Sequence, residues 1–372
     1  MENITGKTGD YTVSLLFNLT YVLLVKDNNI KVSKPTNWYR VPLKKEQLKS
    51  LNARDNVKGG IQTAGPLLIM GFTGILACAS VQLLSWPFWI LTALLHGTVT
   101  KFTSNAVHEL VHGTVFKSGW TNSFFCQLFA FIGWHNHHAF WASHSKHHKN
   151  TLHSPHDQEV VLSPPQHFTA KDFLRKGFLN IHAMIDIISK HFQICIGYFK
   201  GEWLQITVDA LKEADKKKVI GWSRLLLLGH VGLSVVFLIS GHWYLIIFVS
   251  LTPAYGNWLF YLINNTQHTG LMDNTKDFRL CCRTIDLNPF FRFLYWQMNY
   301  HTAHHMYPGV PCYRLSDLHK AIEHDLPSKT SGIWETWRQI ITIQNRQLQE
   351  PDYQFAQMLP ETEILHGMTP RK

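Results

Sequence analysis

The sequence predicts an all-α integral membrane protein in which four transmembrane helices form two hairpins and a helical cap lies in the cytosol. The composition is 45% hydrophobic and only 16% charged, against roughly 25% charged residues in an average soluble domain. Charged residues are absent from two long stretches, residues 65–100 and 225–263. Because a helix needs about 20 apolar residues to cross a bilayer, each stretch is long enough for two spans.

A short turn signal interrupts each uncharged stretch. Residues 85–87 are Ser-Trp-Pro, and residues 240–243 are Ser-Gly-His-Trp. Pro and Gly punctuate helices, and Trp favours the membrane interface. Four buried helices of a soluble protein are the alternative, but soluble helices usually have a polar face. Transmembrane helices are therefore expected at about 65–84, 88–107, 224–240 and 243–263.

The distribution of positive charge predicts the orientation of the hairpins. All 35 Lys and Arg residues lie outside the two uncharged stretches. Positive charge is retained on the cytoplasmic side of a membrane, so both termini and the segment between the hairpins are expected in the cytosol. The net charge of +10 also favours anionic lipid head groups. Nucleic acid is not an expected partner, because the basic residues are scattered and no recognition motif accompanies them.

These features predict three parts along the chain. Residues 1–60 are expected to form a cytosolic N-terminal segment, and residues 61–325 the multi-pass membrane domain. Residues 326–372 are expected to form a cytosolic C-terminal helix and tail.

Three clusters stand out among the 23 histidines of the chain. Residues 108–112 are HELVH, residues 144–148 are HSKHH, and residues 301–305 are HTAHH. A weaker element, NNTQH at residues 264–268, follows the fourth expected span. Because residues at positions i, i+3 and i+4 share one face of a helix, each cluster is expected to aim two or three imidazoles at a common point.

The clusters together predict a metal site. Imidazole is a ligand of iron, copper, zinc and nickel, and the expected topology places all of the clusters on one side of the membrane. A single zinc ion takes three or four protein ligands, so a larger set suits two metal ions. The candidate ligands are nine histidines: His108, His112, His144, His147, His148, His268, His301, His304 and His305.

The three clusters, spaced around two apolar hairpins, resemble the histidine boxes of the membrane fatty-acid desaturase and hydroxylase superfamily over about residues 60–320. The resemblance implies two iron ions per chain, held in the cytosolic cap, with O2 as the oxidant. It also implies a lipid or other hydrophobic substrate and a separate electron donor, ferredoxin or cytochrome b5. In acyl-CoA desaturases an Asn four residues before a further His reaches the metal region, and Asn264 and His268 match that spacing.

The expected activity is oxidation of unactivated C–H bonds. Such bonds have no acidic proton and no electrophilic centre, so acid–base chemistry does not open them. Desaturation of a fatty acyl or lipid chain is the first expectation, and hydroxylation of a lipid, a hydrocarbon or a small non-lipid metabolite stays open. A membrane zinc metalloprotease is a remote alternative, since HExxH is also the signature of that class. A non-catalytic metal carrier or sensor is a further alternative function.

Several other residues are expected to support the site. A ligating imidazole usually donates its second N–H to a carboxylate or a carbonyl. Glu109 and Asp157 are the candidate active-site carboxylates for this role, and Asp317 is a third candidate. For each of them, a capping or helix-surface role is the alternative. His96, His230 and His242 fall within or beside the expected spans and are predicted to be packing or interface residues.

Overall fold

The computed structural model describes residues 37–154, 156, 157, 159, 160 and 168–360. By its internal contacts the chain divides into two units, Met1–Asn37 and Trp38–Lys372, and all of the described helices belong to the second. Most of the expected N-terminal segment, residues 1–36, and the end of the expected C-terminal tail, residues 361–372, lie outside the described residues.

The described residues confirm the all-α prediction, since their only extended pairings are four isolated bridges. Short π and 3₁₀ turns connect several of the helices. The α-helices are α2 Lys45–Leu51, α3 Asn56–Leu83, α4 Trp86–Lys101, α5 Thr103–Val111, α6 Gly119–Ile132, α7 His137–Asn150, α8 Ala170–Gly177, α9 Ile181–Cys195, α10 Glu202–Leu204, α11 Glu213–Ile239, α12 Trp258–Asn264, α13 Phe278–Cys281, α14 Pro289–Leu294, α15 His301–Met306, α16 Leu315–Ile322 and α17 Gly332–Gln347.

Two of the described helices, α3 and α11, are long and apolar enough to cross a membrane. They contain most of the first and third expected spans. Helix α3 begins earlier than expected because Asp55 caps it, with Oδ1 accepting hydrogen bonds from the backbone N–H groups of Val57 and Lys58. Its 28 residues correspond to a length of about 42 Å.

The second expected span, 88–107, was predicted as one helix and is instead two, α4 and α5, separated at Phe102. Threonine side chains on both sides of the break bond to backbone carbonyls three residues earlier. Thr100 Oγ1 donates to Gly97 O at 2.9 Å, and Thr103 Oγ1 donates to Thr100 O at 2.7 Å. Such bonds compete with the regular helical pattern. The break lies between an apolar helix and the helix that carries the first histidine box.

The fourth expected span, 243–263, is also not a single helix. A π turn at Ile246–Ser250 and a 3₁₀ turn at Thr252–Ala254 precede α12. Pro253 has no N–H to continue a helix, and Gly256 has a φ of +73°, which glycine adopts without strain. A Cβ atom at Gly256 would lie 2.5 Å from the backbone of Gly97. The broken segment therefore packs directly on α4.

Side chains from other elements satisfy the carbonyls that the break leaves free. His96 Nε2 bonds to Phe248 O at 2.9 Å, and Lys101 Nζ donates to Pro253 O at 2.6 Å. His230, from α11, is also buried against this segment, where its Nδ1 bonds to the hydroxyl of Ser250 at 3.1 Å. Irregular backbone at membrane depth is tolerated where such partners exist. His96 and His230 thus pack in the interior, as expected, and also hydrogen-bond there.

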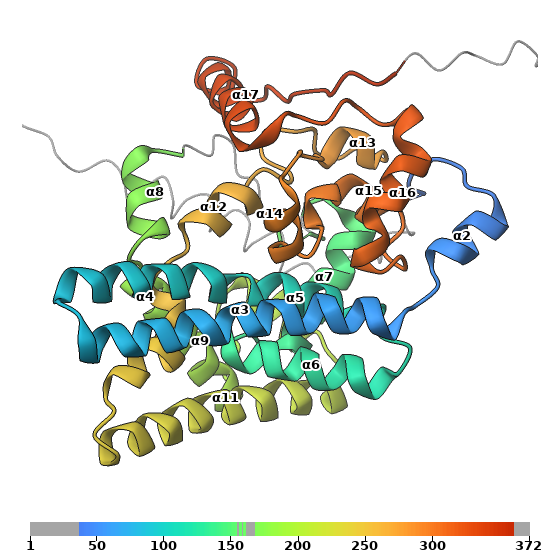
Figure 1. Cartoon of the computed structure of the whole chain (residues 1–372). Helices are drawn as coiled ribbons and strands as arrows, with labels where there is room; N and C mark the ends of the chain where they lie inside the picture. The colour runs from blue at the N-terminus through green and yellow to red at the C-terminus, as the bar shows by residue number, and fades with distance from the viewer. Residues whose placement is uncertain (1–36, 155, 158, 161–167, 361–372) are drawn as a thin grey trace, which may run out of the picture. The chain divides into compact units, whose positions relative to one another are not determined.

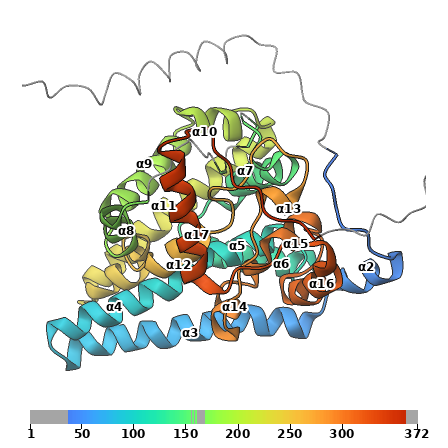
Figure 2. The ribbon, with the colours of Figure 1, turned by 90° about the horizontal axis from the view of Figure 1, so that it is seen from above.

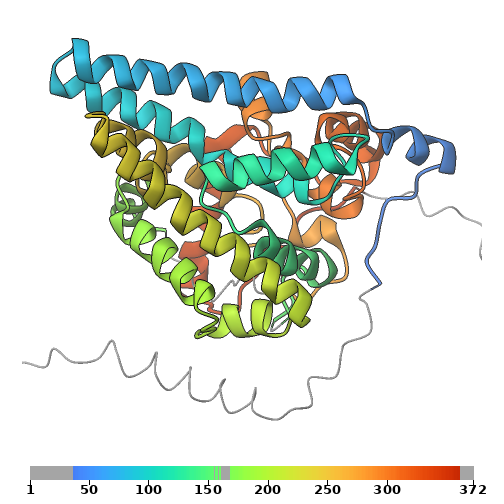
Figure 3. The same cartoon turned by 90° about the horizontal axis from the view of Figure 1, so that it is seen from below.

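The two turns expected from the sequence lie side by side. Gln82, near the end of α3, donates through Nε2 to the hydroxyl of Tyr244, just after the turn that follows α11, at 2.8 Å, so the two hairpin turns lie close together. Helix α4 runs back along α3, and α9 packs beside α11 (Figure 3). On the opposite side, α17 lies over α12 (Figure 2), where Trp337 Nε1 donates to Leu262 O at 2.8 Å. In Figure 1 the histidine-bearing helices α5, α7 and α15 lie between α17, above them, and α6 and α11, below them.

Candidate metal centre

Three short helices and one turn carry the nine histidines of the boxes. His108 lies in α5, His112 is the C-cap residue directly after it, and α7 and α15 carry the second and third boxes. His268 lies in the turn after α12. Seven of the nine side chains are buried, and His112 and His148 are half-buried. The prediction that these histidines come together is therefore correct.

The histidines form two adjacent groups, not one. Within each group the ring nitrogens all lie within 4.8 Å of one another. The five-histidine group consists of His108, His112, His144, His148 and His304. The four-histidine group consists of His147, His268, His301 and His305.

Helix geometry explains how the boxes divide. In the second box, His144 and His148 are four residues apart and enter the five-histidine group, while His147 enters the other. The third box does the reverse, since His301 and His305 enter the four-histidine group and His304 the five-histidine group. Each box therefore aims two imidazoles at a common point, as expected, and in these two boxes the third imidazole belongs to the other group. Adjacent helical residues differ by about 100° in direction, so neighbouring imidazoles serve different groups.

The Nε2 atoms converge at distances that suit metal ligands. For a metal–nitrogen bond of about 2.1 Å, neighbouring nitrogens lie about 3.0 Å apart at right angles and about 3.4 Å apart at tetrahedral angles. Neighbouring Nε2 atoms in the structure are 2.8 to 3.1 Å apart, close to the spacing of about 3.0 Å for ligands at right angles. The Nε2 pairs are His112–His144, His144–His148, His148–His304, His268–His301 and His301–His305.

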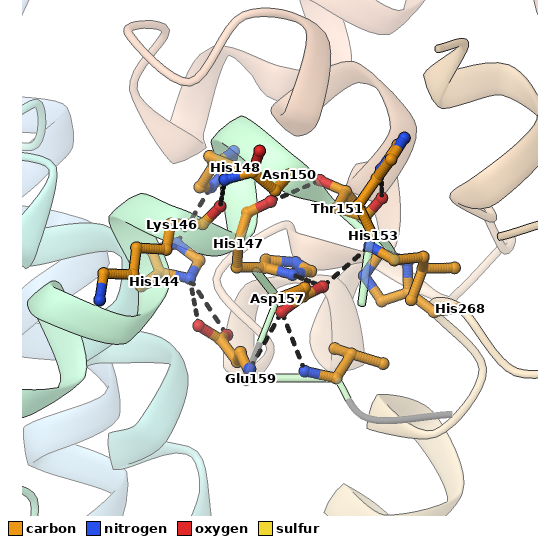
Figure 4. Close-up of polar contacts among 12 residues, drawn as sticks. His144, Lys146, His147, His148, Asn150, Thr151, His153, Asp157, Glu159 and His268 are labelled. Atoms are coloured by element: carbon orange, nitrogen blue, oxygen red, sulfur yellow. Dashed lines mark hydrogen bonds and ion pairs between the residues drawn. The ribbon is translucent and has the colours of Figure 1, made fainter. Parts of the chain in front are cut away.

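A carboxylate holds the rear nitrogen of His147 (Figure 4). His147 Nδ1 donates to Asp157 Oδ2 at 2.8 Å. The same carboxylate accepts the backbone N–H groups of Leu152, Glu159 and Val160 at 2.9 to 3.3 Å. Asp157 thus orients the His147 ring and also fixes the loop after α7. It makes the ring contact expected of it from the sequence.

Two glutamates act in the same way on the five-histidine group. Glu109 Oε1 accepts from His108 Nδ1 at 3.0 Å and lies 3.6 Å from His304 Nδ1. Glu159 accepts from His144 Nδ1 at 2.9 Å (Figure 4). Glu109 was expected in this role and Glu159 was not. The signal available for Glu159 was a second acidic residue two positions after Asp157, in the segment that follows the second box.

Neutral oxygens hold two further rings. His268 Nδ1 donates to Cys281 O at 2.8 Å. The hydroxyl of Thr151 donates to His147 O and accepts from His305 Nδ1 at 3.2 Å. In His268 and His305 the ring proton is therefore on Nδ1, and the lone pair of Nε2 points toward the other rings of the four-histidine group.

Two other candidates have different surroundings. Asn264 Oδ1 accepts a hydrogen bond from the hydroxyl of Tyr295 at 3.2 Å, so that oxygen already has a partner. Asp317 is exposed on α16. The prediction that Asp317 supports a ligand was therefore wrong, because its position on α16 turns it to the surface and not toward the histidines.

Burial keeps the imidazoles neutral. It penalises the charged form, which lowers the pKa of His108 and His268 to about 3 and of His112 to about 4. Burial also lowers the pKa of five more rings well below the ordinary value of 6.5. These are His144, His148, His301, His304 and His305. For His147, burial lowers the pKa, but the charges of Asp157 and Glu159 outweigh it and the pKa is raised. At neutral pH most of the rings therefore offer a free lone pair, which is the form that binds metals.

The residues present fit a pair of transition-metal ions. The donor set is all imidazole, which suits iron among other metals, and five nitrogens exceed the four of a structural zinc site. Carboxylates behind the rings are the usual supports of metal-bound histidine. Burial raises the pKa of Glu109 and Glu159 to about 7, and a cation bound at the rings would favour their charged forms.

Comparison with known families agrees with this site. The sequence matches the fatty acid desaturase family over residues 84–337, which includes all three histidine boxes and most of the described helices. Because the match spans more than half of the chain, this protein belongs to the fatty acid desaturase family, whose members are oxidoreductases known for their use of iron. No curated protein matches the chain.

Proposed function

We propose that this protein is a membrane-bound di-iron oxidoreductase that uses O2 and external electrons to desaturate a fatty acyl or lipid chain. The observation that carries the proposal is the pair of adjacent imidazole groups, with five and four nitrogens, inside a chain of this family. When bound there, two iron ions would supply the O2-dependent removal of hydrogen from an unactivated C–H bond. The residues of the chain would bind the metal ions, position the imidazole ligands and exclude water.

The ligand assignment follows from the two groups. One iron would be held by the five-histidine group and the other by the four-histidine group, with Asn264 beside them as a further candidate. Asp157, Glu109 and Glu159 would position the rings by accepting their Nδ1–H protons. Burial of the rings excludes bulk water, which protects reactive chemistry from side reactions.

The membrane arrangement is part of the same proposal. Helices α3 and α11 would cross the bilayer, and the shorter α4 and the broken segment before α12 would complete two hairpins. The contact between Gln82 and Tyr244 supports this topology, because it places both turns at one end. With no basic residue in either turn, that end would face away from the cytosol. Both termini, the C-terminal helix and the metal centre would then be cytosolic.

The electron donor would be ferredoxin or cytochrome b5, approaching from the cytosol. His112 is one of the two half-buried histidines of the metal centre. Trp141 is 43% exposed and lies edge-on to this ring, with 5.6 Å between ring centroids. The net charge of +10 favours encounter with an acidic partner.

The position of Glu109 argues against a zinc protease. In that class the Glu of HExxH acts as a general base beside the metal-bound water. Here the Glu109 carboxylate lies behind the rings, against the Nδ1 atoms of His108 and His304. It is therefore placed to orient ligands.

Product analysis tests the proposed function. The purified, iron-loaded protein would be given a reduced ferredoxin system, ¹⁸O2 and a mixed lipid and metabolite extract, and the products analysed by mass spectrometry. We expect acyl products that have lost two hydrogen atoms and contain no ¹⁸O. Incorporation of ¹⁸O into the product would identify a hydroxylase, and the size of that product would show whether its substrate is a lipid or a small metabolite.

Two controls make the result specific. Omitting the donor should stop turnover, because external electrons are required. A His242→Ala variant should retain full activity, since His242 is exposed in the turn after α11 and its side chain hydrogen-bonds only to Ser240 among the described residues. Absence of any oxidised product in the complete mixture would count against the proposed function.

A further inference from the structure

A cavity of about 350 Å³ opens beside the start of α3, outside the metal centre. Residues from α3, α14 and the segment leading into α16 surround it. Its volume lies within the range of small-ligand pockets. The polar side chains that line it are Lys58, Gln62, Arg292, Gln297, Tyr313 and Ser316.

The cavity is positively charged. Lys58 and Arg292 are its only charged lining residues, and both are cations. Neither forms an ion pair within the described part of the chain. Asp55, three residues before Lys58, attracts it electrostatically but forms no ion pair with it among the described residues, and its carboxylate caps α3. The cavity thus presents two cations without a carboxylate among its walls.

Arg292 and Ser316 have donors that suit phosphate oxygens, whereas the hydroxyl of Tyr313 already donates to Val115 O. Arg292 uses one N–H to bond the hydroxyl of Tyr300 at 2.7 Å, and a guanidinium has five such donors. The hydroxyl of Ser316 accepts from Tyr300 at 3.4 Å, so its own proton has no partner among the described residues. Arginine and lysine are the usual cationic partners of phosphate.

An apolar surface continues from the cavity along α3. Ile61 lines the cavity and is 61% exposed. Further along the same helix, Leu68, Phe72 and Ile75 are each about 70% exposed. Helix α3 is one of the two helices apolar enough to cross a membrane. The cavity therefore lies where a head group would meet the bilayer, and acyl chains could follow the exposed face of α3.

We propose that this cavity binds the phosphate of an anionic phospholipid whose acyl chains lie along α3. Basic pockets beside transmembrane helices on the cytoplasmic side are recognised sites for such head groups. A soluble phosphate ester would offer the same charge but no acyl chains for Ile61 and Leu68. The site is separate from the metal centre and does not depend on the reaction that the protein catalyses.

Lipid retention measured by native mass spectrometry tests this site. The full-length protein would be purified from nanodiscs that contain phosphatidylglycerol or phosphatidylcholine. We expect phosphatidylglycerol to be retained preferentially. The double variant Lys58→Gln/Arg292→Gln should weaken that retention by about 10- to 30-fold, because each surface cation contributes on the order of a tenfold effect or less.

Matched variants separate the site from general effects. Lys49→Gln/Arg338→Gln removes two exposed cations that do not line the cavity and should leave retention unchanged. Lys58→Arg/Arg292→Lys keeps the charge and should retain the lipid. Equal retention of both lipids by the unaltered protein would overturn the proposal. So would displacement of the lipid by soluble glycerol phosphate at equal affinity, or equal losses in the two double Gln variants.

Discussion

Alanine at His147 or at His304 is expected to abolish turnover and to lower the iron content. Each substitution removes one nitrogen from a different group, since His147 belongs to the four-histidine group and His304 to the five-histidine group. Both side chains are 1% exposed or less, so water does not readily replace the lost imidazole. We expect each variant to bind closer to one iron per chain than two.

Iron analysis and turnover, measured on the same preparations, check this result. His182→Ala is a suitable control, because His182 is exposed on α9 and belongs to neither group. It should keep the iron content and activity of the unaltered protein. Full activity in the His147 or the His304 variant would remove that residue from the ligand set.

Alanine at Asp157 is expected to weaken iron binding by about 10- to 100-fold, the usual effect of losing a partner behind a metal-bound histidine. The carboxylate accepts His147 Nδ1–H and three backbone N–H groups. Its loss frees the His147 ring and leaves buried donors unpaired, which costs roughly 1–3 kcal/mol for each group. We therefore also expect a lower unfolding temperature.

Two comparisons distinguish positioning from general destabilisation. Asp157→Asn keeps an oxygen that can accept from His147, so it should bind iron more tightly than Asp157→Ala. Asp215→Ala removes an exposed carboxylate whose one ion pair in the described part of the chain is with Lys218, and such a surface pair contributes about 1 kcal/mol or less. If the Asp157→Ala protein bound iron as tightly as the unaltered protein, Asp157 would not position His147.

The histidine set could be predicted because spacing within a short helix is a local property. His144 and His148 are four positions apart, as are His301 and His305, and each pair shares a face wherever its helix lies. Helix geometry turns His147 away from His148, but which group each ring joins depends on how α7 and α15 face each other, and that could not be predicted. The sequence contains neither the crossing of these helices nor the position of His268 between them.

Supporting carboxylates were predictable only in part. Glu109 is adjacent to a ligand on the same helix, so its proximity follows from the sequence. Glu159 reaches His144 only because Asp157 holds the loop after α7 in place through the backbone N–H groups of Glu159 and Val160. Loop conformation of this kind depends on tertiary contacts, and the sequence pattern alone does not specify it.

The apolar stretches predicted membrane-type segments but not their continuity. A continuous helix and a broken helix whose free carbonyls accept hydrogen bonds from other side chains have equally hydrophobic sequences. Hydrophobicity alone therefore does not distinguish them. Pro253 and Gly256 were visible signals for the break before α12. The partners that make the break tolerable, His96 and Lys101, lie about 150 residues away in the sequence.

The number and kind of metal ions per chain test the central claim most directly. The purified protein would be analysed for metals by mass spectrometry, and the coordination of bound metal by X-ray absorption. We predict two iron ions per chain with nitrogen neighbours at about 2.1 Å, a bond length typical of imidazole ligands. A single zinc ion per chain, or iron without nitrogen neighbours, would contradict the account.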